Sequence, residues 1–349
     1  TQILILSIMN LRNHTILIIF GSLIILNFNN VLVLTKQLLG QFYTTTDPFN
    51  ISDAFKDWYK MVPKDVTFLE PFAGAGNLFK YIDVDWDGYD IAPNHPKVVE
   101  RNTIRDFPRG YKVCITNPPY LAKTVVSRKK LPVVLNHEDL YLDALQVCLD
   151  NCDYVAAIIP STFWNQNLFK DRLYAWDKFD MKLFSDTDNP AGVAYFVPES
   201  VNTTRTFISG KEINLTANNT PRSNNFPVKF NPKDFSPYLV NGIDTIKSNN
   251  IHLRRTDGFD TSKLVNSKGE CKTTNRNMFP IECPYLEDEH LDGINQMIED
   301  WRKETKDFFL TSFKTCKYDG TYRKRISFIE VRWILSNYFS LTEAFKLST

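Results

Sequence analysis

Four consecutive residues, Asn117-Pro118-Pro119-Tyr120, combine a side-chain amide, two rigid imino acids and an aromatic ring. The amide oxygen and a backbone carbonyl can each accept one N–H of a planar amine. This holds the amine nitrogen in line with an electrophile and favours the positive charge that develops on it. The two prolines stiffen the loop, and Tyr120 can stack on a flat substrate. The tetrapeptide therefore predicts chemistry at an exocyclic amine. A Pro-Pro turn with a packed tyrosine is the competing interpretation.

A glycine-rich turn lies upstream of this tetrapeptide. Residues 70–76 read Glu-Pro-Phe-Ala-Gly-Ala-Gly and follow a strand-like run at 66–69, while the tetrapeptide follows another run at 111–116. Asp90 closes a third strand-like segment, where an acidic side chain can accept hydrogen bonds from a ribose diol. Ligands of open α/β sheets bind at the carboxyl ends of the strands. The pattern predicts an α/β protein that holds a nucleoside cofactor beside a planar, amino-bearing substrate.

Three segments of the chain resemble motifs of one enzyme family. Asn117 to Tyr120 match its catalytic motif, Phe72 to Gly76 match its F-x-G-x-G cofactor motif, and residues 40–44 (GQFYT) resemble the segment over the methionine end of its cofactor. The chain thus resembles the S-adenosylmethionine-dependent DNA adenine-N6 methyltransferases that accompany restriction systems. The order of the segments is that of their gamma class. The resemblance covers residues 36–200 and is only positional beyond them.

This resemblance implies a fold and a reaction. The fold is α/β, with a mostly parallel Rossmann-like methyltransferase sheet and a C-terminal α+β target-recognition domain. An adenine flipped out of duplex DNA would stack on Tyr120, while Asn117 and the Pro118 carbonyl would hold its N6 amine. The methyl group of S-adenosylmethionine would pass directly to that amine, with no covalent enzyme intermediate and no metal. The expected catalytic residues are Asn117, Pro118, Pro119 and Tyr120.

The family's pattern also implies further site residues. Asp106 precedes the catalytic strand, where an acidic residue of the family reaches the cofactor's adenine amine, and Phe107 would pack beside that ring. A turn-capping Asp with a core Phe is the alternative, and an acidic surface turn is the alternative for Asp90, because Asp83, Asp85 and Asp87 lie close by. The expected cofactor-binding residues are Phe42, Tyr43, Thr44, Glu70, Phe72, Gly74, Gly76, Asp90, Asp106 and Phe107. The expected DNA-contacting residues are Lys123, Arg128, Lys129, Lys130, Phe196, Arg323, Lys324 and Arg325.

Basic residues gather in two places that suit contact with DNA. Residues 121–130 carry four of them, which we expect in a mobile loop that grips phosphates, unless they form a solvated face. Residues 313–333 interleave aromatic rings with six Lys or Arg, and a surface strand pair with a packed face is the alternative there. Phe196 is the candidate for a second aromatic face on the flipped base, although ordinary strand packing is the stronger interpretation.

Length and composition indicate a globular protein with two domains. The 349 residues are 43% hydrophobic and 23% charged, and the formal net charge of +1 gives no overall attraction to nucleic acid. Residues 200–349 nevertheless carry 22 Lys and Arg against 18 Asp and Glu. The six cysteines form no C-x-x-C pair, which favours buried free thiols over a zinc site. We expect an extension (1–35), a methyltransferase domain (36–200) and a target-recognition domain (201–349), in a cytoplasmic protein.

The N-terminal extension contains an apolar stretch. Residues 15–34 carry no charge and match the length of a membrane-spanning helix, but Asn27, Asn29 and Asn30 interrupt them. A dispensable extension, a membrane anchor and a packed apolar element all stay open as interpretations.

Hydrophobic periodicity and turn residues predict the remaining elements. Helices are expected at 47–62, 77–82, 137–149, 161–176 and 286–309. Strands are expected at 66–69, 83–91, 111–116, 154–160, 181–184 and 193–197, with a linker or exposed hairpin at 202–225.

Other functions fit the same tetrapeptide. An RNA adenine, a protein glutamine or the N4 amine of cytosine can be held in the same way, although cytosine-N4 activity more often carries Ser at the position of Asn117. A non-catalytic DNA-binding relative would keep the fold alone. The expected partners are double-stranded DNA and a separate cognate restriction endonuclease.

Overall fold

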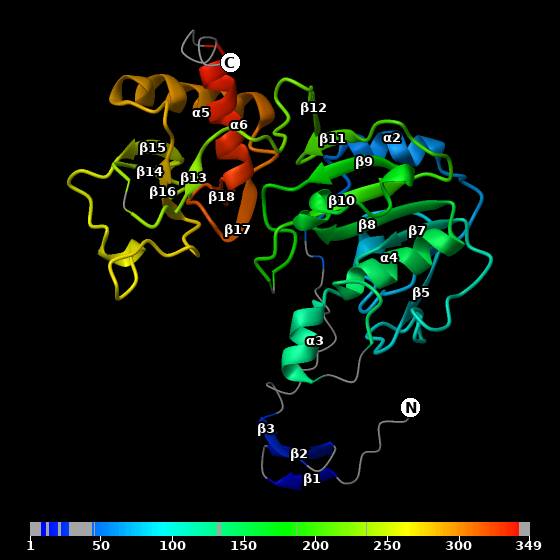
Figure 1. Cartoon of the computed structure of the whole chain (residues 1–349). Helices are drawn as coiled ribbons and strands as arrows, with labels where there is room; N and C mark the ends of the chain where they lie inside the picture. Colours follow the sequence, from blue (N-terminus) through cyan, green and yellow to red (C-terminus); the bar gives the residue numbers. More distant parts are fainter. Residues whose placement is uncertain are drawn as a thin grey trace. The chain divides into compact units, whose positions relative to one another are not determined.

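The computed structural model describes residues 8–11, 14–19, 22–27, 44, 46–130, 134–185, 187–234 and 236–341 (Figure 1). The chain forms two compact units. Unit 1 comprises Thr1–Thr45 and Pro63–Ile159, and unit 2 comprises Thr46–Val62 and Pro160–Thr349. The predicted domain boundary between residues 200 and 201 stays a prediction.

Unit 1 is built on parallel strands. They are β4 (Phe68–Glu70), β5 (Trp86–Asp90), β6 (Val98–Glu100), β7 (Val113–Thr116) and β8 (Tyr154–Pro160). Their order is β8-β7-β4-β5-β6, and every neighbouring pair is parallel. Each residue of β4 and β7 is buried, as expected for strands covered on both faces. The predicted α/β class with a mostly parallel sheet is confirmed.

The strand order creates a topological switch point. From β4 the chain moves outward through β5 to β6, and it then returns to place β7 on the other side of β4. Connections that leave neighbouring strands in opposite directions open a crevice outside their carboxyl ends, which is where ligands bind in such sheets. Glu70 ends β4 and Asn117 directly follows β7. Both predicted motifs therefore flank this crevice.

The α-helices described in unit 1 follow the Asn117–Tyr120 tetrapeptide. Helix α4 (Leu140–Asn151) begins at the N-cap residue Asp139, whose side chain accepts a hydrogen bond from Tyr141 N. Residues 121–130 were expected to be a mobile loop, and this expectation is wrong for most of them, because α3 spans Lys123–Lys129. The predicted helix at 77–82 is a short 3-10 helix, η1 (Leu78–Lys80).

Unit 2 begins with helix α2 (Asp53–Met61) and four strands of mixed direction. The strands are β9 (Leu173–Lys178), β10 (Ala191–Phe196), β11 (Arg205–Ile208) and β12 (Lys211–Ile213), in the order β12-β11-β9-β10. Strands β10 and β12 run antiparallel to their neighbours, and β11 runs parallel to β9. The polar stretch at 202–225 thus contains a hairpin.

The predicted helix at 161–176 is wrong. Its residues form the short 3-10 helices η2 (Ser161–Asn165) and η3 (Lys170–Arg172) and then enter β9. The strand expected at 181–184 lies earlier in the sequence, at β9. Short apolar runs do not distinguish a strand from a buried helix, and here pairing on both sides with β10 and β11 satisfies the backbone of β9.

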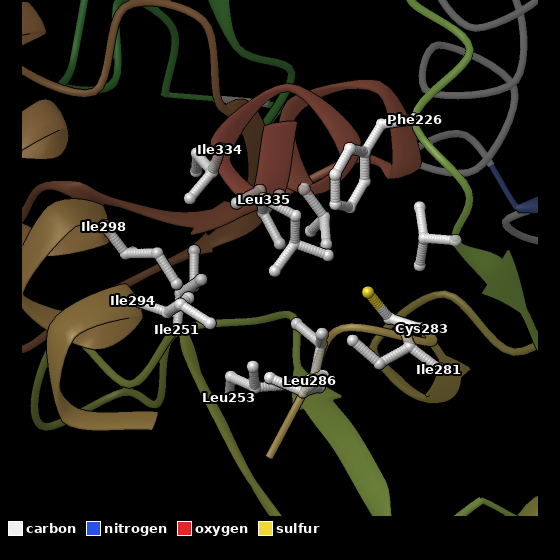
Figure 2. Packing of buried hydrophobic residues seen from close by; sticks show 14 of the residues in the cluster. Phe226, Ile251, Leu253, Ile281, Cys283, Leu286, Ile294, Ile298, Ile334 and Leu335 are labelled. Carbon is white, nitrogen blue, oxygen red and sulfur yellow. The ribbon is translucent and has the colours of Figure 1, made fainter. Parts of the chain in front are cut away.

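The C-terminal part of unit 2 packs two helices on an antiparallel sheet. The sheet has the order β13-β16-β14-β15, from strands β13 (Lys229–Phe230), β14 (Tyr238–Asn241), β15 (His252–Arg255) and β16 (Met278–Glu282). Helices α5 (Leu291–Thr305) and α6 (Phe328–Leu341) cover it, and β17 (Thr311–Cys316) pairs with β18 (Tyr322–Arg325). Figure 2 shows Ile294 and Ile298 of α5 and Leu335 of α6 meeting Leu253 and Ile281 of the sheet in one apolar core.

The N-terminal segment contains a small antiparallel sheet, β1-β2-β3. Its strands are β1 (Ile8–Leu11), β2 (His14–Ile19) and β3 (Ser22–Asn27). Most of the apolar stretch at 15–27 is therefore strand, and residues 28–34 lie outside the described part of the chain. Among the described residues, no helix is both long and apolar enough to cross a membrane.

A buried lysine joins two parts of unit 2. Lys178, the last residue of β9, donates from Nζ to the carbonyl oxygens of Phe308 at 2.6 Å and Leu310 at 2.8 Å. Burial, together with the charge of nearby Lys324, lowers the pKa of Lys178 to about 7. A neutral amine keeps two N–H groups, enough for both carbonyls.

We expect this lysine to give unit 2 a pH-dependent stability. Because the pKa of Lys178 is about 7 when folded and near 10.5 when unfolded, the unfolded chain binds more protons between these values. The free energy of unfolding should then rise by about 2 kcal/mol from pH 7 to about pH 9 in urea titrations. The Lys178→Met variant should lose this rise, and Lys229→Met, at an exposed ion pair, should keep it. Equal pH slopes in all three proteins would contradict the expectation.

Candidate active site

The glycine turn after β4 is held by a buried carboxylate. Asp90, at the end of β5, accepts hydrogen bonds from Gly74 N and Ala92 N, both at 2.8 Å. Gly74 and Gly76 have positive φ angles of 50° and 65°, which favour glycine. Asp90 therefore fixes the shape of the turn, and the alternative of an acidic surface turn does not describe it. A ribose contact by Asp90 stays a prediction.

Gly76 also lacks room for a side chain. A Cβ at this position would lie 3.1 Å from the Cη2 atom of Trp86, whose ring stacks on Phe79 with centroids 4.8 Å apart. Glycines in such turns of α/β sheets allow the backbone to approach a ligand closely.

Glu70 places an unpartnered carboxyl oxygen at the end of β4. Its side chain is 2% exposed, and its Oε2 has no hydrogen-bond partner within the described ranges. Burial, reinforced by the neighbouring Asp90 carboxylate, raises the pKa of Glu70 well above its usual range. Thr116, the last residue of β7, is fully buried and its Oγ1 is likewise unpartnered there. Buried polar atoms without partners are uncommon, and a ligand in the crevice would satisfy such atoms.

The structure brings the Asn117–Tyr120 tetrapeptide together with Thr44. Asn117 donates from Nδ2 to Thr44 Oγ1 at 3.4 Å, and the Tyr120 hydroxyl lies 2.9 Å from Asn117 Oδ1. The same hydroxyl lies 2.7 Å from the carbonyl oxygen of Ile158 in β8. One hydroxyl proton is shared between the two acceptors. Thr44 belongs to the segment resembling the family's cofactor cover, while Phe42 and Tyr43 lie outside the described residues.

Tyr120 is enclosed rather than exposed. Its side chain is 8% exposed and meets Tyr141 of α4 edge to face, with centroids 6.2 Å apart. Burial raises the pKa of Tyr120 well above its usual range, so its hydroxyl stays protonated. Asp139 closes the loop after the tetrapeptide by accepting a hydrogen bond from Leu121 N at 2.9 Å. The role of Asp139 in holding this loop was not predicted, although its position before an apolar helical stretch is an N-cap signal.

Of the remaining predicted cofactor residues, Phe72 follows β4, and Asp106 and Phe107 lie between β6 and β7. Asp106 is exposed and forms an ion pair with Arg101 at 3.0 Å, and Phe72 and Phe107 are half-buried. Their contacts with a cofactor stay predictions. Thr103, which sequence reasoning missed, donates to the carbonyl oxygen of Pro71 at 2.7 Å and so supports the glycine turn.

The predicted DNA-contacting residues have different environments. Lys123, Arg128, Lys129 and Lys130 lie on or directly after α3 and are exposed, and Lys123 pairs loosely with Glu138 at 3.5 Å. Their contact with phosphates stays a prediction. Arg323 and Arg325 are half-buried.

Two of the expected DNA contacts need correction. Phe196 is 0% exposed and packs against Phe163, so strand packing accounts for it. Lys324 is 2% exposed, and its ammonium group binds Asp180 and Ser312, so it is an internal residue of unit 2. Alternation along β18 explains the latter, because Lys324 points to the opposite face from its two arginine neighbours.

Comparisons with known proteins give distant structural likenesses. No family model matches the chain, and no curated protein does. A protein from Listeria monocytogenes, provisionally described as a class I S-adenosylmethionine-dependent methyltransferase, superposes with a TM-score of 0.33 and 12% identity, over 47% of this chain and 68% of its own. The methyltransferase subunit of a type I restriction-modification system from Streptococcus thermophilus gives 0.36 and 12%, over 54% and 52%.

A third likeness is to the M protein of the type I restriction enzyme EcoKI. Its TM-score is 0.35 with 13% identity, over 54% of this chain and 53% of its own. The chain thus spans about half the length of these two type I subunits. TM-scores below 0.5 carry no argument about function, so the functional conclusion rests on the residues of the site.

The Asp90 hydrogen bonds yield a testable expectation. In Asp90→Asn the side chain keeps a single acceptor oxygen, so one of the two backbone N–H groups loses its partner. Urea unfolding should show a loss of about 1–3 kcal/mol. Asp83→Asn, at an exposed position of the same segment, should change the stability by less than about 0.5 kcal/mol. An Asp90→Asn variant as stable as Asp83→Asn would show that the carboxylate does not hold the turn.

Proposed function

We propose that this protein is a site-specific methyltransferase that transfers the methyl group of S-adenosylmethionine to N6 of adenine in duplex DNA. One observation carries the proposal. The glycine turn and the Asn117–Tyr120 tetrapeptide flank the same switch-point crevice of a parallel sheet, and Thr44 of a third family-like segment contacts Asn117 there. This arrangement supports the proposal, because the resemblance to the gamma-class enzymes implies that the three segments form one site.

The crevice suits a nucleoside cofactor with a cationic end. The turn at Gly74 and Gly76 allows close backbone approach, and Asp90 stands at the strand end where a ribose diol would be bound. The unpartnered Glu70 Oε2 would accept a hydrogen bond from the ammonium group of such a cofactor. S-adenosylmethionine, when bound, supplies an electrophilic methyl group on a sulfonium.

The tetrapeptide is proposed to act on the amine of the substrate. The lone pair of an aromatic amine is delocalised into the ring, so the amine needs both orientation and stabilisation of the charge that develops. Asn117 Oδ1 and the Pro118 carbonyl accept its two N–H groups and provide both. In the structure, the hydroxyl of Tyr120 holds the Asn117 amide in place, and once the base has flipped the ring would move to stack on it.

The exposed basic residues around α3 support a nucleic-acid substrate. Lys123, Arg128, Lys129 and Lys130 would contact phosphates near the flipped base. A cytoplasmic location and protection of DNA from a separate restriction endonuclease follow from this proposal.

Removing the Asn117 amide tests the proposal. Asn117→Ala should lower transfer of radiolabelled methyl to plasmid DNA by about 100-fold or more, because the developing charge loses its acceptor. S-adenosylmethionine binding, measured by calorimetry, should change by less than about threefold, because Asn117 contacts the amine and not the nucleoside. Asn151→Ala, at an exposed amide on α4, is the matched control. Retained methyl transfer in Asn117→Ala would reject the assignment.

The two roles of Tyr120 can be separated. Tyr120→Phe keeps the stacking ring and loses the hydroxyl that holds Asn117, so methyl transfer should fall about tenfold. Tyr120→Ala loses both and should fall about 100-fold or more, with weaker DNA binding in gel-shift titrations. Equal activity of the Phe variant and the wild type would show that the hydroxyl does not position Asn117.

A further inference from the structure

A pocket of ≈ 760 Å³ lies in the C-terminal part of unit 2, away from the tetrapeptide in the sequence. Its walls come from the loop after β15, the turn before β16, and strands β17 and β18. The lining residues are Phe259, Asp260, Lys263, Leu264, Thr274, Asn275, Arg276, Asn277, Met278, Phe313 and Arg325. The lining thus includes three cationic residues and one acidic residue, Asp260.

Arg325 is the residue from the basic run of β18 that lines the pocket. Arg323 donates from Nε to the carbonyl oxygen of Asp244 at 2.8 Å, and Lys324 is bound internally to Asp180. Arg325 instead lines the pocket, with its guanidinium carbon 5.0 Å from the ring centroid of Phe313. Within the described ranges no hydrogen bond or ion pair holds this guanidinium, although its charge partly offsets the rise that burial causes in the pKa of the half-buried Glu330.

A second arginine is held in a similar way. The guanidinium carbon of Arg276 lies 4.6 Å from the ring centroid of Phe328, and its Nη1 donates to the carbonyl oxygens of Thr273 at 2.8 Å and Asn275 at 2.9 Å. These bonds use one of the two terminal nitrogens. Stacking on the ring and the bonds of one terminal nitrogen already orient this guanidinium. It therefore loses little conformational entropy when its other N–H donors bind an anion.

The wall that carries Arg276 is fixed by a glycine. Gly242 N donates to Asn277 O at 2.7 Å, and Gly242 O accepts from Ile326 N at 2.9 Å, directly after Arg325. A Cβ on Gly242 would lie 2.7 Å from the Phe279 ring and 3.1 Å from Arg276 O. This backbone contact ties the Arg276 and Arg325 segments together, so the two arginines belong to one built site.

We infer that this pocket binds duplex DNA, through Arg276 and Arg325, as the surface by which the protein grips or reads its target. The inference rests on the proposed function. Guanidinium forks match phosphate oxygens and the O6 and N7 atoms of guanine, and the exposed amide of Asn277 can pair with a base edge. Cationic groups interleaved with rings and amides are the chemistry of nucleic-acid contact.

The test measures binding of the full chain to a fluorescent duplex over a range of salt concentrations. Arg276→Ala and Arg325→Ala should each weaken binding about fivefold to tenfold, and each should reduce the slope of log affinity against log salt by about one if the contact is to a phosphate. If the contact is to guanine, the variant should instead relax the sequence preference at one position of the methylated site. Arg222→Ala removes an exposed arginine of the same unit that does not line the pocket, and it should bind like the wild type.

The conservative variant Arg325→Lys separates charge from geometry. It should bind nearly as well as the wild type at a phosphate contact and lose the preference at a guanine contact, because lysine cannot form the two-pronged bond. It also covers the case in which Arg325→Ala does not fold, and Arg276→Ala, at an exposed position, provides an independent test.

The outcomes separate this inference from the proposed function. Unchanged affinity, salt slope and sequence preference in both Ala variants would overturn the pocket, whatever the methylation activity. Duplex binding that depends on these arginines, without any methyl transfer, would retain the pocket and reject the proposed function. Methylation of DNA by the wild-type chain, combined with DNA binding that depends on neither arginine, would reject the pocket as a DNA site and retain the proposed function.

Discussion

The site depends on the pair of hydrogen bonds that the Asp90 carboxylate accepts from Gly74 N and Ala92 N. They join the end of β5 to the glycine turn that follows β4, and this turn borders the switch-point crevice. Glu70 lies close enough that the charge of Asp90, added to burial, favours its protonated form. One buried carboxyl group is thereby committed to the scaffold, and the other is left with an open oxygen for a ligand.

A few hydrogen bonds also hold the tetrapeptide that follows β7. The Tyr120 hydroxyl joins Asn117 to β8 through the Ile158 carbonyl, and Asp139 anchors the loop that follows. The Asn117 amide is therefore positioned by backbone and side chains within unit 1. Preorganisation of this kind would favour the proposed transfer to a weakly nucleophilic amine, because the orientation cost is met before the substrate arrives.

Sequence reasoning predicted the elements that local signals define. The turn at Gly74–Gly76 and the motif at Asn117 follow buried apolar strands, so their place at strand ends could be predicted from residue order alone. Residues 161–176 were misassigned because β9 gains its conformation from neighbours distant in the sequence. Charge counting failed at Lys324, since alternation and a partner at Asp180 decide which members of a basic run face inward. The pairing of Arg276 with Arg325 in one pocket had no sequence signal, because the two residues are far apart in the sequence.

The methylated product identifies the substrate of the reaction most directly. Plasmid DNA that carries no methylation, incubated with the protein and S-adenosylmethionine, can be digested to nucleosides and analysed by mass spectrometry. We expect N6-methyladenine, located by methylation-aware sequencing at one short recurring sequence. N4-methylcytosine would contradict the assigned base, and unmodified DNA from a protein that binds S-adenosylmethionine would contradict DNA as the substrate.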